Sequence, residues 1–215
     1  EKMKASKYPW AAINITKDDG SAIEGLGGVM VKDVGGLKVA LVPVAQDTSP
    51  EVSSTGSLKF LPTVDAAIAA AEKAREDGAD IVVAVVQTDM ENDRALIKSH
   101  KFDLVLSGDD HSYATAYDGV TAYVETSIDG QFLTPVDLTV EVGEKDGKKT
   151  ISWTPAFRFI DTATVAPDPD SQAMADEFTK KLDDTLNVEI GTTDTPLDSR
   201  RNVVRAEEST MGDLI

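Results

Sequence analysis

The distribution of apolar residues predicts two neighbouring buried strands near the middle of the chain. Residues 81–86 read Ile-Val-Val-Ala-Val-Val, a run without polar interruption. Such a run is typical of a strand that is covered on both faces in a parallel sheet. Residues 104–106 predict a second strand of this kind, and residues 94–99 leave room for a short helix between the two. This order predicts parallel strands joined by a crossover.

The residues before this pair predict further elements of the same sheet. Four are expected: a strand at residues 8–15, a hairpin strand before Gly35-Gly36, its partner at residues 37–42, and a helix that Pro62 opens and Gly78 ends. Thr63 is the expected N-cap of that helix, and its alanine-rich part from Ala66 to Arg75 has high helix propensity. A polar loop is expected at residues 46–57.

The pattern changes after residue 111. Residues 121–126 and 134–142 alternate apolar and polar side chains, which predicts half-exposed antiparallel strands. Asp146-Gly147 is a hairpin turn signal. Three later elements are expected: an amphipathic helix at residues 171–186, a short strand at Val203-Val204, and a helix beginning at Glu207.

The charge, cysteine content and apolar runs of the chain indicate which binding partners and metal sites are disfavoured. The formal charge of −17, from 38 acidic and 21 basic residues, disfavours nucleic acid and anionic membranes and favours cations. The absence of cysteine excludes disulfides and thiolate metal sites, and it fits a periplasmic or secreted protein. Because no apolar run reaches about 18 residues, no membrane span is expected.

Each of the two central strands runs directly into residues that can bind a metal ion. Gln87 and Asp89 follow the first strand, while Asp109 and His111 follow the second within Ser-Gly-Asp-Asp-His. Ligands of open α/β sheets bind outside the carboxyl ends of the strands. Asp109 and His111 are two residues apart on an expected extended segment, so both can point to one side. Carboxylate and imidazole together suit Mn, Zn, Fe or Mg, with hard ligands favouring Mg or Mn.

The same residues also have structural interpretations. The Asp-Asp-His segment can be a solvated turn whose aspartates bond to their own backbone, and Gln87 with Asp89 can be a helix-capping loop. His100 is expected at the surface, Asp93 as a helix-start charge facing the macrodipole. Dinucleotide-binding, P-loop and nucleophile-elbow glycine motifs are absent from the sequence.

Three blocks in this order resemble the calcineurin-like metallophosphoesterases of the bacterial 5′-nucleotidase / 2′,3′-cyclic-nucleotide 2′-phosphodiesterase family. They are residues 8–15 with 36–42, residues 81–111, and the segments 190–193, 197–200 and 205–209. In the second block the family has an apolar strand, a histidine, an aspartate six residues on, and then Gly-His-x-His. By spacing to Asp93, Gln87 stands at the family's histidine, or Asp89 does if the alignment shifts by two.

The resemblance therefore implies an altered metal site. Asp109 stands at the first histidine of Gly-His-x-His, and His111 keeps the last ligand. Two imidazoles thus become an amide and a carboxylate, which shifts the site toward Mg or Mn or weakens it. The resemblance implies two divalent ions (Mn, Mg or Zn) that activate water to hydrolyse a small-molecule phosphate ester, a nucleotide. The alternative is a non-catalytic binding or scaffold descendant with a degraded metal site.

The resemblance also implies the organisation of the chain. An α/β metallophosphoesterase-type sandwich with a mixed sheet is expected, followed by a linker helix. Residues 1–166 would form the C-terminal half of the metallophosphoesterase domain, 167–189 the linker helix, and 190–215 the start of a C-terminal 5′-nucleotidase domain. The chain is interpreted as a central fragment, so its partners include the missing N-terminal and C-terminal parts of the same protein. No catalytic residue is expected within the fragment, which alone would be inactive.

Overall fold

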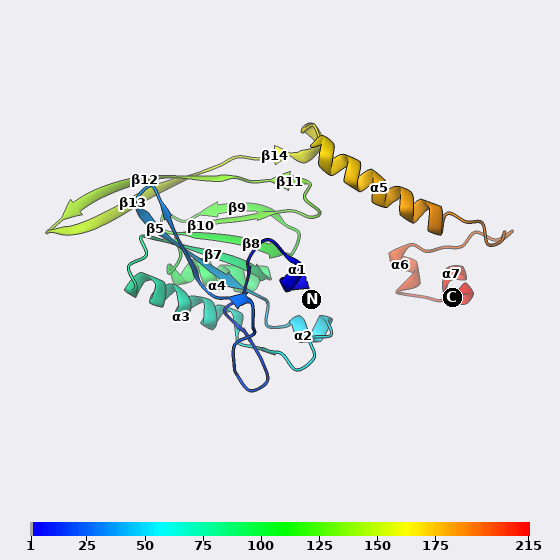
Figure 1. Cartoon of the computed structure of the whole chain (residues 1–215), viewed down its shortest axis with the longest axis horizontal. Helices are drawn as coiled ribbons and strands as arrows, with labels where there is room; N and C mark the ends of the chain where they lie inside the picture. Colours follow the sequence, from blue (N-terminus) through cyan, green and yellow to red (C-terminus); the bar gives the residue numbers. More distant parts are fainter. Residues whose placement is uncertain (1) are drawn as a thin grey trace. The chain divides into compact units, whose positions relative to one another are not determined.

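The computed structural model describes residues 2–215, which fall into two compact units. The first unit ends at Val165, and the second spans Ala166–Ile215. Figure 1 labels the helices and strands of both units. The first unit contains the sheet and all four candidate metal-binding residues.

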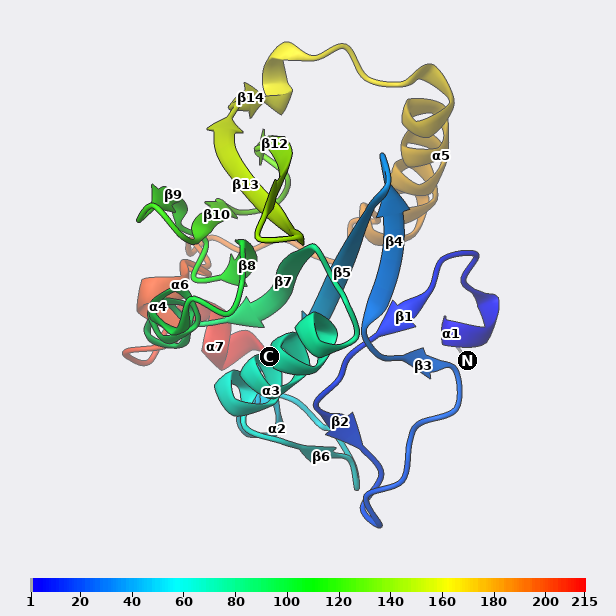
Figure 2. The same cartoon turned by 90° about the vertical axis from the view of Figure 1, so that its left-hand side faces the viewer.

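A six-stranded mixed sheet forms the centre of the first unit. Its strands lie in the order β4 (Met30–Val34), β5 (Leu37–Val44), β7 (Ile81–Thr88), β8 (Leu104–Asp109), β10 (Ala122–Thr126) and β9 (Tyr113–Tyr117) (Figure 2). The four inner strands are parallel, and each edge strand runs antiparallel to its neighbour. The predicted mixed α/β class, the hairpin and the parallel pair are confirmed.

The other elements of this unit surround the sheet. They are α1 (Lys2–Ala5), β1 (Trp10–Ala11), β2 (Ile15–Thr16), β3 (Leu26–Gly27), α2 (Ser49–Val52), β6 (Lys59–Phe60), α3 (Thr63–Glu76), α4 (Met90–Ser99), β11 (Phe132–Leu133), β12 (Val136–Lys145), β13 (Lys148–Phe157), β14 (Ile160–Asp161) and the 3-10 helix η1 (Thr162–Thr164). The loop expected at residues 46–57 thus contains a short helix, and the hairpin turn at Asp146-Gly147 is confirmed.

Successive side chains of β7 divide the core between the two faces of the sheet. Val82, Ala84 and Val86 pack with the buried alanines of α3 and with α4, and Ile81 and Val83 belong to a second cluster on the other face. The β12–β13 hairpin contributes to that second cluster (Figure 1). Both faces are covered from Ile81 to Ala84, which explains the consecutive apolar residues there, whereas Val85 near the end of the strand is 41% exposed.

One inner strand differs from the prediction. The alternation at residues 121–126 predicts a half-exposed antiparallel strand, but β10 lies parallel to β8 and antiparallel to β9. Its apolar residues are at most 3% exposed. The alternation misleads because its polar member Glu125 is also buried and forms a hydrogen bond with Tyr123.

The buried side chains of Asn14 and Thr63 both form hydrogen bonds with the backbone of Ala45, just after β5. Asn14 divides the strand expected at residues 8–15 into β1 and β2, and its amide bonds to the backbone of Ala45 and Leu61. Thr63 is not the N-cap that we predicted, since Pro62 occupies that position. The Thr63 hydroxyl instead donates to the carbonyl of Ala45 at 3.1 Å, a use that its burial makes more favourable than capping.

The second unit consists of helices and loops. Its helices are α5 (Pro169–Leu186), α6 (Arg201–Val204) and α7 (Thr210–Leu214). The amphipathic helix is confirmed, whereas Val203-Val204 lie in α6 and not in the predicted strand. A strand needs a partner for its backbone, and the described residues 166–215 provide none, while helical bonds are local. Across residues 2–215, no helix combines the length and the apolar character that crossing a membrane requires.

Candidate metal-binding edge of the sheet

The carboxyl ends of β7 and β8 bring two of the predicted ligands together. In the register of these strands, Gln87 lies opposite Gly108 and Thr88 opposite Asp109. The Gln87 side chain donates from Nε2 to Oδ1 of Asp109 at 2.6 Å. The two residues are therefore neighbours, and their bond aligns an amide and a carboxylate at this edge of the sheet.

Asp89 has a structural role in addition to its place in the predicted site. It is the N-cap of α4, and its Oδ1 accepts a hydrogen bond from the amide of Asn92 at 2.8 Å. The carboxylate of Asp110 accepts a bond from the amide of Met90, at the same helix end. Two carboxylates thus satisfy the free amides of α4 and lie at the positive end of its dipole.

His111 lies on the turn after β8 but not on an extended segment. Its φ is 58° and that of Asp109 is 136°, so the backbone leaves the strand conformation between them. The extended segment that we expected to carry both side chains therefore ends at Asp109. His111 is exposed. Within residues 2–215, no three His, Cys, Asp or Glu side chains lie close enough to hold a metal ion.

A buried polar cluster lies directly beneath this edge, and the sequence did not predict it. Asp93 lies in the first turn of α4, as expected of a helix-start charge, but it is fully buried. Its Oδ1 accepts a bond from the Ser107 hydroxyl at 2.8 Å, and its Oδ2 contacts the Tyr123 hydroxyl at 3.0 Å. Tyr123 also lies 3.2 Å from Oε2 of Glu125, whose other oxygen accepts the amide of Ser112. The cluster therefore joins α4, β8, β10 and the turn after His111.

Burial perturbs the titration of two groups in this cluster. The Tyr123 hydroxyl has one proton to donate and lies within hydrogen-bond distance of both the Asp93 and the Glu125 carboxyl groups. Burial raises the pKa of Asp93 to about 6, with the charges of Glu125 and Asp110 adding to the effect against the bonds from Ser107 and Tyr123. Burial also raises the pKa of Tyr123, followed by the charge of Asp93. The phenol therefore stays protonated.

Weak sequence signals for this cluster do exist. Met90, Asp93 and Leu96 are spaced by three residues, so Asp93 falls on the buried side of its helix. Tyr123 and Glu125 are two apart on a strand and must share a face. Both patterns are equally common on solvated elements, and only the packing of β10 inside the sheet shows that they are buried.

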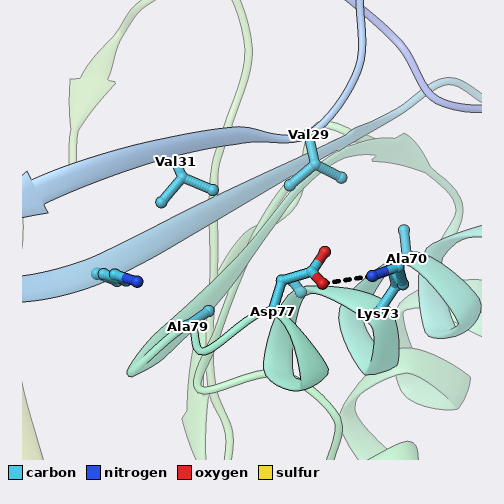
Figure 3. A pocket seen from close by; sticks show the side chains of 8 residues that line it. Val29, Val31, Ala70, Lys73, Asp77 and Ala79 are labelled. Atoms are coloured by element: carbon cyan, nitrogen blue, oxygen red, sulfur yellow. Dashed lines mark hydrogen bonds and ion pairs between the residues drawn. The ribbon is translucent and has the colours of Figure 1, made fainter.

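A cavity of about 310 Å³ lies at the opposite edge of the sheet. It is lined by Lys38 at the start of β5, by Val29 and Val31, and by residues around the end of α3, where Lys73 forms an ion pair with Asp77 (Figure 3). None of the four candidate metal-binding residues lines this cavity, so it is separate from them.

His100, the other histidine of the chain, lies at the surface, as expected. Its Nε2 is 2.9 Å from a carboxylate oxygen of Asp118.

Comparisons with known proteins give the same fold and a consistent set of relatives. The chain is 27% identical over 199 residues to the trifunctional nucleotide phosphoesterase protein YfkN of Bacillus subtilis, a match covering 89% of this chain and 13% of that protein. A 5′-nucleotidase precursor from Thermus thermophilus superposes with a TM-score of 0.70 at 15% identity, covering 99% of this chain and 45% of that one. The calcineurin-like phosphoesterase YfkN superposes with a TM-score of 0.64 at 18% identity, covering 83% and 64%.

No protein-family model matches the sequence. The similar proteins are phosphoesterase hydrolases, and the fold is that of metallophosphoesterase-type 5′-nucleotidases, which confirms the resemblance and the fold predicted from the sequence. The chain spans only 13% of the length of its curated relative and less than half of the 5′-nucleotidase precursor.

Proposed function

From this likeness to 5′-nucleotidases and calcineurin-like phosphoesterases, we propose that the chain is part of a metal-dependent hydrolase of nucleotide phosphate esters. The observation that carries the proposal is the pairing of Gln87 with Asp109 at the carboxyl edge of β7 and β8, with His111 on the adjoining turn. A phosphate ester is an anion, and the chain has a formal charge of −17. A cation at this edge would offset the repulsion between the acidic chain and such a substrate.

The donor types fit a divalent ion, but their number is incomplete. Gln87, Asp89 and Asp109 offer oxygen and His111 offers nitrogen, a set that suits Mg, Mn or Zn. Since residues 2–215 hold no group of three acidic, histidine or cysteine side chains within reach of one ion, the chain would supply only one side of a two-ion centre. When bound, such ions supply an activated water and neutralise the phosphate. The four candidate residues of this chain would hold and orient such ions from one side.

The remaining ligands and the substrate pocket would come from other parts of a longer protein. In this proposal residues 1–166 are the C-terminal half of the metallophosphoesterase domain, 167–189 the linker helix, and 190–215 the start of a 5′-nucleotidase domain. The relative described as a precursor and the lack of cysteine support a periplasmic or secreted location.

The two histidines of the chain allow a direct test. Titration with Mn²⁺ should broaden the NMR signals of the His111 ring at concentrations that leave His100 sharp, because paramagnetic broadening falls steeply with distance. Asp109→Asn should weaken this effect, since it removes a charged ligand. Asp118→Asn, which removes the carboxylate beside His100, is the matched control and should not change the broadening of His111. Equal broadening of both histidines, or of neither, would contradict a metal site at this edge.

A second function, a non-catalytic binding or scaffold descendant, is favoured by one observation. Among residues 2–215, no three His, Cys, Asp or Glu side chains lie close enough to hold one metal ion, as expected of a degraded site. Metal analysis of the longer protein separates the two functions. A stoichiometric pair of ions supports the hydrolase, and an empty protein supports the scaffold.

A further inference from the structure

We propose that Glu125 is a positioning residue that, together with Tyr123 and Asp93, fixes the turn carrying His111. The inference rests on the proposed function, which gives that turn its role in binding. Glu125 lies on β10, and its Oε1 accepts a hydrogen bond from the amide of Ser112 at 3.2 Å. Because Ser112 directly follows His111, this buried carboxylate holds the backbone on one side of the imidazole.

The other side of His111 is held by a second carboxylate. Asp110 accepts a bond from the amide of Met90 at the start of α4. The carbonyl of Ser112 additionally accepts the amide of Ser127 at 2.7 Å, which ties the turn to the end of β10. His111 has a φ of 58°, and a residue other than glycine keeps such a conformation only where its surroundings enforce it. Anchors on both sides supply that enforcement.

Core packing alone does not explain an acid at position 125. Glu125 is 1% exposed, and burying a carboxylate costs free energy unless its oxygens are bonded. Tyr123, two residues away on the same face of β10, is 3% exposed and belongs to the hydrophobic core cluster, so an apolar residue could be accommodated on this face. One oxygen of Glu125 bonds to the turn and the other contacts Tyr123, which in turn contacts Asp93. The acid therefore connects the turn to a buried support that includes α4 and β8.

Amide hydrogen exchange of the 215-residue chain, followed by NMR, tests this assignment. In Glu125→Ala the Ser112 amide should exchange roughly tenfold faster, because its acceptor is gone. In Tyr123→Phe, which does not touch Ser112, exchange of that amide should also rise. Glu125→Gln should retain protection, since the amide oxygen still accepts from Ser112. The ring signals of His111 should shift in the first two variants and not in the third.

The matched control is Thr121→Val. It removes another buried hydrogen bond beside the same strand, from the Thr121 hydroxyl to the carbonyl of Phe102 at 2.8 Å, at the end of β10 away from the turn. It should leave the exchange of Ser112 unchanged. The proposal is overturned if Glu125→Ala and Tyr123→Phe accelerate Ser112 no more than the amides of Ala122 and Val124, because the cluster would then only stabilise the sheet. If Glu125→Ala does not fold, Tyr123→Phe gives the same decision.

A Mn²⁺ titration of the same samples separates this inference from the proposed function. If the wild-type chain shows no broadening at His111, the metal site is refuted, whereas the exchange of Ser112 still decides whether Glu125 positions the turn. If the metal binds, Glu125→Ala should weaken it and Glu125→Gln should not.

Discussion

Asp93 makes the stability of this chain depend on pH. Its carboxyl is fully buried, and burial raises its pKa from 3.8 to about 6. A folded-state pKa above the unfolded value means that the group stabilises the fold at low pH and that this contribution is lost as the pH rises from 4 to about 6. The groups facing it are Ser107, Tyr123, Glu125 and Asp110.

Asp93→Asn should remove this pH dependence. An asparagine can accept from Ser107 and donate to Tyr123, whose proton then goes to Glu125, so every bond of the cluster is satisfied without an additional proton. Relative to this variant, the wild type should lose about 2 kcal/mol of unfolding free energy between pH 4 and pH 7. Urea unfolding at a series of pH values measures the difference. Parallel curves for the two proteins would show that Asp93 does not titrate in this range.

Helix α3 illustrates how one element is specified by small residues. Ala67 and Ala71 are fully buried against the sheet, while Ala69 between them is exposed. The alanines allow the helix axis to lie close to β5 and β7, with both of which the helix is in contact. The close packing of α3 on the sheet therefore depends on the small side chains of its buried face.

Ala71→Leu should destabilise the fold by about 1–3 kcal/mol, because the additional carbons have no space in a close-packed core. Ala69→Leu introduces the same side chain on the exposed face and should change stability by less than about 0.5 kcal/mol. Chemical denaturation of both variants measures the contrast. A similar effect of the two substitutions would mean that the helix packs less closely than described.

At the level of the whole chain, residues 2–215 would supply only part of the proposed metal centre. We expect the purified chain to release no phosphate from a nucleoside monophosphate in the presence of Mn²⁺, because residues 2–215 hold no group of three ligands of the required kinds. A colorimetric phosphate assay measures this, with His111→Ala as the control for trace contaminants. Turnover that disappears in the His111→Ala variant would contradict the expectation.

Much of the candidate site could be placed from the sequence, but its geometry could not. Strand ends rich in polar residues predict a ligand edge, and Gln87 and Asp109 do meet there. The left-handed backbone of His111 has no sequence signal, since a turn of this kind depends on anchors from Met90 and Glu125 that are distant along the chain. The capping role of Asp89 is local and was one of the two interpretations that the sequence allowed.

Local patterns alone determined the parallel pair, the hairpins and the long helices, because the apolar positions and turn residues of each element follow its own short sequence period. Only the tertiary structure decided that β10 is buried between β8 and β9, and with it that Tyr123, Glu125 and Asp93 form one cluster. The physical reason is that burial is a property of neighbours. A polar residue on a strand reads as exposed until another element covers it, and its bonding partners then come from that element.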